Sequence, residues 1–207
     1  MFENLSCQLR FFYYICTMKV IFLDHDGVIC LSSEWGGRFK KQEKWGGRKL
    51  SMTTLEMPLE YRFDNFNKKA VKVLNQIIEE TGAEIVTSSD WKRWANLEEM
   101  GEYYESQGII KKPIALTTNL GQCTWYNGMT WIWSPVWDLE MTRVIEIKQF
   151  LHDHPEVTHW VAVDDLDMGK NGEDWKNWGL DNFVLTPSSN EGIKQSGIKD
   201  KILNFLK

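Results

Sequence analysis

Residues 19–28 read Lys-Val-Ile-Phe-Leu-Asp-His-Asp-Gly-Val, and this stretch decides the fold. An unbroken apolar run that ends abruptly in acidic residues is typical of a strand buried on both faces of a parallel sheet. We therefore expect a strand over residues 19–23. Because ligands of an open parallel sheet bind beyond the carboxyl ends of its strands, functional residues are expected to begin at Asp24.

Two further apolar runs also end in polar clusters. Ala83–Val86 is followed by Thr87-Ser88-Ser89-Asp90, and Trp160–Val163 is followed by Asp164-Asp165. Helical spacing of apolar residues, with capping and stop signals, predicts helices between the strands. The expected strands are 19–23, 83–86, 160–163 and 183–185, and the expected helices are 65–81, 91–107, 139–152 and 198–206. This alternation predicts an α/β fold with a mainly parallel sheet flanked by helices.

Two inserts interrupt the alternation. Residues 32–64 are rich in glycine, serine and charge, and Trp-Gly-Gly-Arg occurs at 35–38 and again at 45–48, which predicts a hairpin or flap. Residues 109–138 are aromatic, and their Asn127-Gly128 step predicts an antiparallel hairpin. We expect an N-terminal extension over residues 1–17, followed by a single domain over 18–207.

The composition argues against several classes of protein. The chain has 207 residues, with 24 Lys and Arg against 29 Asp and Glu and a net charge of −5, which argues against a basic nucleic-acid coat. Its four cysteines form no C-x-x-C pair, so we expect no structural zinc, no dense disulfide framework and a cytoplasmic setting. The longest apolar stretch, around residues 11–23, is too short and too interrupted to span a bilayer, and no membrane contact is expected.

Four carboxylates follow the predicted strands, those of Asp24, Asp26, Asp164 and Asp165. Because they repel one another they are expected to share a cation, and an all-oxygen set without His or Cys favours Mg²⁺. Magnesium in turn suggests a phosphorylated substrate. Asp24 is then placed to attack phosphorus and form an aspartyl-phosphate. Asp26 is placed to protonate the leaving oxygen and later to activate water.

These motifs resemble the haloacid dehalogenase (HAD) superfamily of phosphohydrolases over residues 18–186. The segments similar to its motifs I, II and IV are Lys19–Val28, Ile85–Ser89 and Trp160–Asp165. Ile85–Arg93 and the pattern Arg143-x-x-Glu146-Ile147 are similar to the small HAD domains of "Swiss army knife" RNA-repair proteins. The resemblance implies a Rossmann-like HAD fold with small flap or cap inserts and no large cap domain.

The resemblance also implies roles for individual residues. Ser88 is the hydroxyl that binds the phosphoryl oxygens, and Thr87 is the alternative if the strand ends one residue earlier. Asp165 is a direct magnesium ligand, supported by Asp164. Motif III usually offers a lysine, whereas here Arg143 stands at the start of the matching helix and Lys148 lies five residues later. Since the start of that helix is nearer the strand ends, Arg143 is preferred.

The first insert suggests the substrate. Residues 38–49 carry six basic side chains against Glu43 alone, a local net charge of +5, and cations beside aromatic rings can bind a phosphate backbone and stack bases. The substrate contacts expected there are Lys40, Lys41, Lys44 and Trp45. We expect a magnesium-dependent phosphomonoesterase that acts on a nucleotide or on the terminal phosphate of a polynucleotide. The alternatives are a small-metabolite phosphatase or 5′-nucleotidase and, in another class, a non-catalytic module that binds nucleic acid.

Overall fold

The computed structural model describes residues 17–46, 55–120, 124–126, 131–133, 139–169 and 179–207. Five strands form one sheet in the order β3-β2-β1-β6-β7, and every neighbouring pair is parallel. These strands are β1 Met18–Leu23, β2 Glu84–Thr87, β3 Ala115–Leu116, β6 Val157–Asp164 and β7 Phe183–Leu185. The predicted α/β class with a mainly parallel sheet is confirmed.

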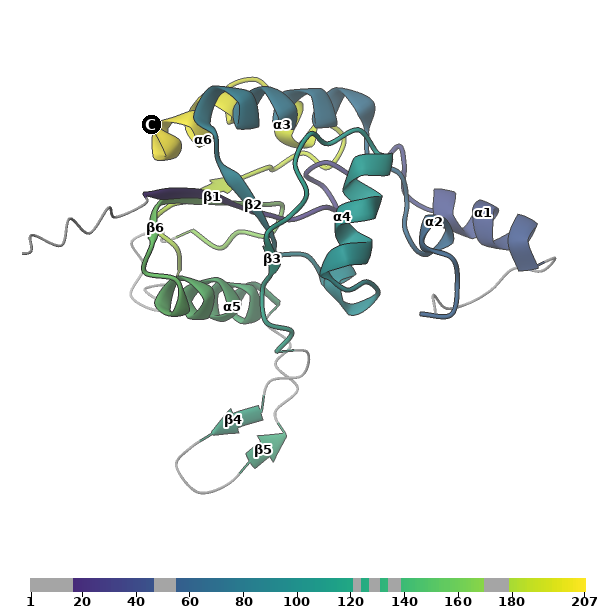
Figure 1. The fold of residues 1–207 in the computed structure, drawn as a ribbon, viewed down its shortest axis with the longest axis horizontal. Helices are drawn as coiled ribbons and strands as arrows, with labels where there is room; N and C mark the ends of the chain where they lie inside the picture. Colours follow the sequence, from purple (N-terminus) through teal and green to yellow (C-terminus); the bar gives the residue numbers. More distant parts are fainter. Residues whose placement is uncertain (1–16, 47–54, 121–123, 127–130, 134–138, 170–178) are drawn as a thin grey trace, which may run out of the picture.

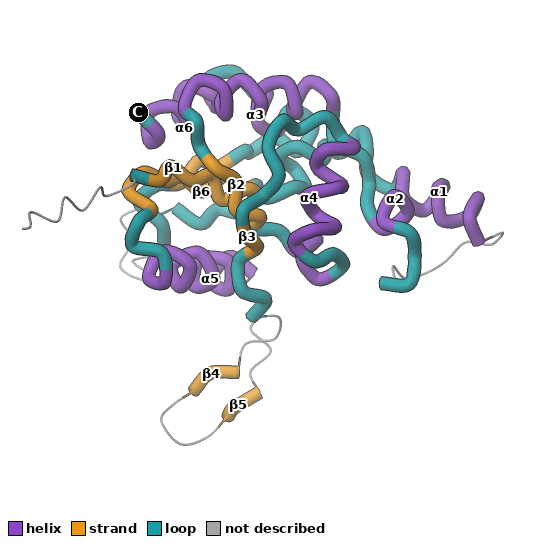
Figure 2. Tube along the Cα trace, viewed as in Figure 1, coloured by secondary structure: helices purple, strands orange, loops and turns teal. Residues whose placement is uncertain are grey.

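Helices cover both faces of this sheet, with α3 and α6 on one side and α5 on the other (Figures 1 and 2). Ile21 and Leu23 of β1 pack in the core cluster that includes α3 and α6, whereas Val20 and Phe22 pack in the cluster that includes α5. Both faces of β1 are therefore buried, which explains its unbroken apolar run. The helices are α1 Gly37–Gly46, α2 Leu59–Arg62, α3 Lys68–Thr81, α4 Leu97–Ser106, α5 Leu139–Asp153 and α6 Ile198–Leu206, with 3₁₀ turns η1 Asp90–Arg93 and η3 Gly192–Lys194.

The sheet register aligns the carboxyl ends of the three central strands. Leu23 of β1 pairs with Thr87 of β2 on one side and with Val163 of β6 on the other. The residues that follow these positions, Asp24, Ser88 and Asp164, therefore meet at one edge of the sheet, as the sequence predicts.

The prediction of one helix over residues 91–107 is wrong at its start, because this segment forms two separate helical elements. The 3₁₀ turn η1 ends at Arg93, and α4 begins after Asn96. The Asn96 side chain accepts a hydrogen bond from the Glu99 backbone N–H at 2.9 Å, and the Glu99 carboxylate accepts one from the Asn96 N–H at 3.0 Å. This capping box starts a new helix. The helix predicted over 65–81 is confirmed from Lys68 onward.

The hairpin predicted within residues 32–64 is wrong in the described part of that insert, which forms α1 and α2 instead. The Asp64 carboxylate accepts hydrogen bonds from the backbone N–H groups of Gly36, at 3.1 Å, and Arg38, at 2.5 Å. A side chain at the far end of the insert thus caps α1, because it binds the N–H of the residue before the helix and that of the helix's second residue. No signal within the helix itself reveals this cap.

The second insert contains the predicted antiparallel pair, β4 Thr124–Tyr126 with β5 Trp131–Trp133. Its Asn127-Gly128 turn lies outside the described residues, as do residues 1–16 of the expected N-terminal extension. Among the helices that the structure describes, none is long and apolar enough to cross a bilayer.

Candidate active site

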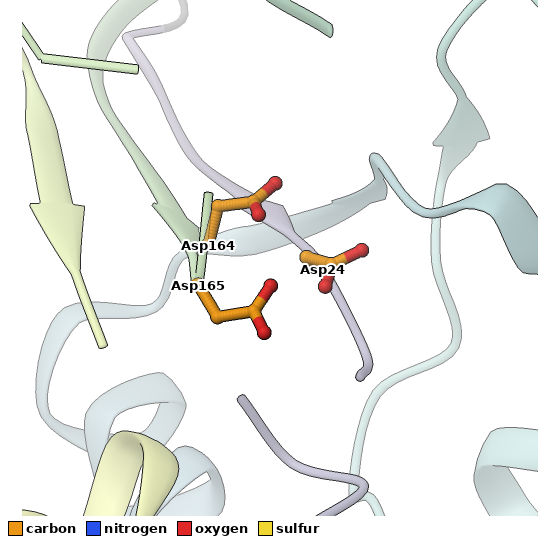
Figure 3. A group of neighbouring side chains, drawn as sticks. All are labelled: Asp24, Asp164 and Asp165. Atoms are coloured by element: carbon orange, nitrogen blue, oxygen red, sulfur yellow. The ribbon is translucent and has the colours of Figure 1, made fainter. Parts of the chain in front are cut away.

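Three carboxylates converge at the carboxyl edge of the sheet. Asp24 follows β1, Asp164 ends β6 and Asp165 comes directly after it. One oxygen from each lies within 4.8 Å of the other two (Figure 3). Asp24 and Asp164 are buried, so two of these carboxylates have little access to water.

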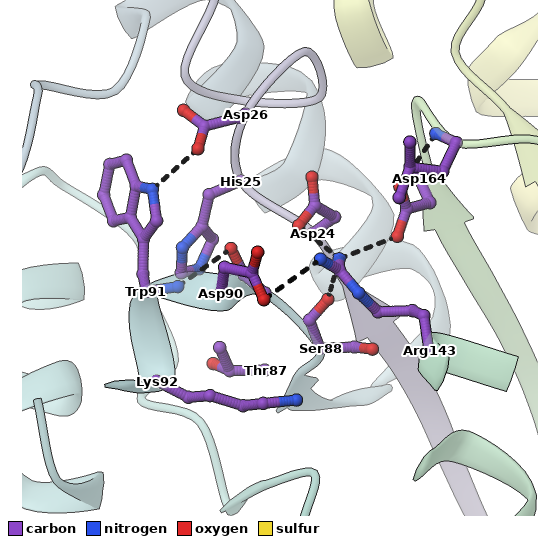
Figure 4. A network of polar contacts seen from close by, with 12 residues as sticks. Asp24, His25, Asp26, Thr87, Ser88, Asp90, Trp91, Lys92, Arg143 and Asp164 are labelled. Carbon is purple, nitrogen blue, oxygen red and sulfur yellow. Dashed lines mark hydrogen bonds and ion pairs between the residues drawn. The ribbon is translucent and has the colours of Figure 1, made fainter. Parts of the chain in front are cut away.

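Arg143 of α5 reaches the same edge and bridges two of the carboxylates (Figure 4). Its Nη1 donates to Oδ1 of Asp24 at 2.6 Å and to Oδ2 of Asp164 at 2.9 Å, and also to the backbone oxygen of Ser88. Burial alone would lower the pKa of Arg143, but the charges of Asp24 and Asp164 raise it. The guanidinium is therefore a permanent cation at the site.

A single arginine does not neutralise this group. Burial raises the pKa of Asp24, and burial together with the Asp24 charge raises that of Asp164 more strongly. Burial, followed by the charges of Asp24 and Asp26, raises the pKa of Asp165 to about 6. Carboxylates whose ionisation is opposed in this way favour a cation, and an all-oxygen donor set fits Mg²⁺.

Asp26 lies apart from the three-carboxylate group. Its Oδ2 accepts a hydrogen bond from the indole Nε1 of Trp91 at 2.8 Å (Figure 4). The sequence predicts a metal ligand here, but Asp26 is not among the three carboxylates that converge, so the structure does not bring its carboxylate to the cation site. Burial raises the pKa of Asp26, and the Trp91 hydrogen bond acts in the opposite direction.

Gly27 is required by the close approach of two loops. Its φ is +70°, in the left-handed region. A Cβ at this position would lie 2.2 Å from Oδ2 of Asp165, closer than any real contact. Glycine therefore lets the loop after β1 pass directly beside Asp165.

Thr87 and Ser88 differ in what their hydroxyls contact. The Thr87 hydroxyl is 2.9 Å from the Tyr104 hydroxyl, which is 2.7 Å from Nε2 of His25. Burial lowers the pKa of His25 to about 3, so this chain of contacts is neutral. The Ser88 Oγ is buried and has no hydrogen-bond partner within the described residues. Of the two hydroxyls, that of Ser88 is the one not engaged by another described side chain.

Comparison with known families identifies this arrangement. The model for the HAD domain in Swiss Army Knife RNA repair proteins matches residues 20–197. The chain belongs to this family. The resemblance found in the sequence is confirmed, and the HAD domain supports a phosphohydrolase. Searches of curated proteins and of solved structures found no match.

The HAD domain also contains a buried ion pair that the sequence analysis did not single out. The Lys92 ammonium is bonded to the Glu146 carboxylate, and these two side chains are 3% and 4% exposed. Lys92 also donates to the Thr117 hydroxyl at 2.9 Å, and Glu146 accepts from the Leu120 N–H at 3.0 Å. Both residues stand in the segments that resemble the Swiss Army Knife domains, but only the fold reveals that they pair. The pair links η1 to α5, one helical turn from Arg143.

The other predicted site residues lie away from the carboxylates of the HAD domain. Lys148 is exposed further along α5, while Arg143 contacts Asp24. Lys40 and Lys44 are exposed on α1.

Trp45, 46% exposed, stacks on Tyr61 with ring centroids 5.9 Å apart. Lys41 is engaged within the insert, because its ammonium donates to the Phe63 backbone oxygen at 2.7 Å and to Oδ1 of Asn65 at 3.1 Å. To bind a substrate, the Lys41 ammonium would have to give up these hydrogen bonds within the insert. Its substrate contact stays a prediction.

Proposed function

We propose that this HAD domain hydrolyses phosphate monoesters through a phosphorylated Asp24, and that its substrate is a nucleotide or the terminal phosphate of a polynucleotide. The observation that carries this proposal is the separation of two aspartates on one loop. Asp24 lies with Arg143 and two further carboxylates, whereas Asp26 is bonded to Trp91. This separation supports Asp24 as the nucleophile and Asp26 as the acid and base.

The proposed reaction has two steps. The Asp24 carboxylate attacks phosphorus, the bond between phosphorus and the leaving oxygen breaks, and Asp26 gives that oxygen its proton. A water then attacks the phosphoryl group and Asp26 accepts its proton, which releases inorganic phosphate and restores Asp24. The raised pKa of Asp26 favours the protonated acid that the first step needs.

The remaining residues bind the phosphoryl group. Arg143 supplies a fixed positive charge beside Asp24, and the unpartnered Ser88 hydroxyl supplies a donor. Asp24, Asp164 and Asp165 would hold Mg²⁺. When bound, the ion offsets the repulsion between an attacking carboxylate and a phosphate dianion.

The substrate class rests on the first insert and on the family. Lys40, Lys44 and Trp45 are exposed on α1, and cations beside an aromatic ring suit a polynucleotide. The relatives in the family are described as RNA repair proteins. The alternative of an inactive binding module is disfavoured, because Asp24, Asp164 and Asp165 carry more negative charge than Arg143 offsets, and such a cluster is costly to retain without chemistry.

The test is phosphate release with Mg²⁺ from p-nitrophenyl phosphate, mononucleotides and oligonucleotides phosphorylated at the 3′ or 5′ end. We expect turnover of all three classes, with the highest kcat/KM on oligonucleotides. Asp24→Asn is the matched control, because it keeps the side chain's shape but removes the nucleophile. Equal rates for Asp24→Asn and the wild type would contradict the mechanism. A preference for mononucleotides would favour the 5′-nucleotidase alternative.

A further inference from the structure

The segment that leads into α1 is anchored beside Asp26. The Trp35 Nε1 donates to the backbone oxygen of Cys30 at 3.2 Å, and Cys30 pairs with Asp26 in an isolated β-bridge. The backbone N–H groups of Gly36, directly before α1, and of Arg38, its second residue, donate to the buried Asp64 carboxylate. The start of the helix is therefore fixed to the loop that carries the proposed acid.

Arg38 lies in this fixed first turn, and its side chain lacks an acceptor. Its Nε is shielded from solvent and has no hydrogen-bond partner within the described residues. None of the ion pairs among the described residues includes its guanidinium, whose carbon lies 5.0 Å from the centroid of the Phe39 ring. Buried donors almost always have partners, because an unmet donor is costly. Because Arg38 as a whole is only partly buried, a ligand that reaches its guanidinium would supply the acceptor that the described residues do not.

Arg38 is also linked to the residues that hold the proposed acid. Its backbone N–H donates to Asp64, and the neighbouring Phe63 stacks on Trp91 with ring centroids 4.7 Å apart. Trp91 in turn donates to Asp26, so Arg38 belongs to the part of the site that holds Asp26. Since Asp26 is proposed to protonate the leaving oxygen, Arg38 lies on the leaving-group side of the phosphoryl group, whereas Arg143 lies beside the nucleophile.

We propose that Arg38 binds a second phosphate carried by the leaving group of the substrate. This inference rests on the function proposed above and adds a determinant of specificity to it. Guanidinium binds phosphate through two parallel hydrogen bonds, so an arginine with free donors is suited to this group. The leaving group of p-nitrophenyl phosphate or of a nucleoside monophosphate offers no such phosphate. A nucleoside bisphosphate and a phosphorylated polynucleotide end both do.

The experiment compares substrates with and without that second phosphate. The pair is adenosine 5′-monophosphate and adenosine 3′,5′-bisphosphate, with a phosphorylated oligonucleotide as a third substrate. Arg38→Met removes the guanidinium. Arg38→Lys keeps the positive charge but cannot form the two parallel hydrogen bonds of a guanidinium. Lys72→Met is the matched control, because it removes one exposed charge from α3. The readout is the ratio of kcat/KM for bisphosphate over monophosphate.

We expect Arg38→Met to lower this ratio by roughly tenfold or more, mainly through KM, because a charge-assisted contact is lost. Arg38→Lys is expected between the wild type and Arg38→Met, and Lys72→Met is expected to keep the wild-type ratio. If kcat/KM falls equally for the bisphosphate and for the oligonucleotide, Arg38 binds a second phosphate from a nucleotide or from a polynucleotide. A loss on the oligonucleotide alone supports a site for its phosphodiester. A ratio unchanged for both substrates would overturn the proposal.

A binding measurement separates this proposal from the proposed function. Adenosine 3′,5′-bisphosphate is titrated into Asp24→Asn and into Asp24→Asn/Arg38→Met, neither of which turns it over. A Kd at least tenfold weaker in the double variant supports the role of Arg38 even if the wild type hydrolyses no phosphomonoester. Equal Kd values in the two proteins would overturn it, whatever the activity of the wild type.

Discussion

Nη1 of Arg143 lies 2.6 Å from Oδ1 of Asp24, although 119 positions separate the two residues in the sequence. The same nitrogen donates to Asp164, so one cation holds the ends of β1 and β6 together. This contact places α5 against the site and gives the buried Asp24 carboxylate a counter-charge. Arg143, the residue that the sequence analysis prefers for motif III, thus contacts two carboxylates at once.

Arg143→Met is expected to lower kcat by about 10²–10³-fold, because a preorganised donor at the phosphoryl group is lost. Arg143→Lys is expected to keep part of the activity, since one ammonium can replace the charge but has a shorter reach to the second carboxylate. The measurement is p-nitrophenyl phosphate hydrolysis by variants shown to be folded by circular dichroism. Wild-type kcat in Arg143→Met would assign motif III to another cation, with Lys148 the first to test.

Ser88 and Thr87 are expected to separate function from stability. Ser88→Ala is expected to lower kcat/KM with little change in the melting temperature, because its Oγ has no partner within the described residues. Thr87→Val is expected to destabilise the fold by about 1–3 kcal/mol, because it breaks the buried contact with Tyr104. Urea unfolding and kinetics of both variants check this, with Thr87→Ser as the conservative control. The reverse pattern would make Thr87 the phosphoryl ligand.

Mg²⁺ is expected to raise the melting temperature, because it binds the folded carboxylate group and not the unfolded chain. Asp165→Asn is expected to remove most of this gain.

The stability of the metal-free protein is expected to depend on pH through Asp165. The pKa of Asp165 is raised to about 6 in the fold, so its ionisation opposes folding. The contribution of Asp165 to stability therefore falls as the pH rises from about 4 to above 6.

The measurement is a thermal melt in EDTA from pH 4 to pH 8, with the difference between wild type and Asp165→Asn as the readout. We expect the variant to gain stability relative to the wild type as the pH rises. A difference that stays constant with pH would contradict a raised pKa of Asp165 in the folded protein.

Lys92 and Glu146 are expected to show strong coupling. Either Lys92→Met or Glu146→Leu alone leaves one buried charge without its partner, which costs about 3–5 kcal/mol. The double variant is expected to recover much of that loss, because no charge remains buried there. A double-mutant cycle from urea unfolding measures the coupling. Additive losses would indicate that the two side chains do not depend on each other.

The sequence reveals the convergence of Asp24, Ser88 and Asp164, because each directly follows an apolar strand and parallel strands end at one edge. It does not reveal interactions between distant segments. The Asp64 cap that starts α1 comes from the opposite end of the insert, and the Lys92–Glu146 pair joins two separate helical elements. The break before α4 is different, since Asn96 and Glu99 form a capping box whose residue types and spacing are visible in the sequence.

The basic face of α1 provides the last prediction. Each phosphate contact on a single strand contributes a slope of roughly −0.7 to the dependence of log affinity on log salt. Lys40→Ala/Lys44→Ala removes two exposed cations from this helix, so we expect weaker binding of an oligonucleotide and a slope less negative by about 1.4. Lys41 is left intact, because its ammonium supports the insert through Phe63 and Asn65.

The measurement is fluorescence anisotropy of a labelled, phosphorylated oligonucleotide bound to Asp24→Asn protein at 50 to 200 mM salt. The control replaces Lys68 and Lys72, two exposed cations of α3, with alanine, which changes the net charge equally. If the effect came from overall charge, both double variants would shift binding alike. If only the α1 substitutions make the slope less negative, the result supports α1 as the surface that binds the polynucleotide. Equal slopes in all three proteins would leave a small phosphorylated metabolite as the better substrate.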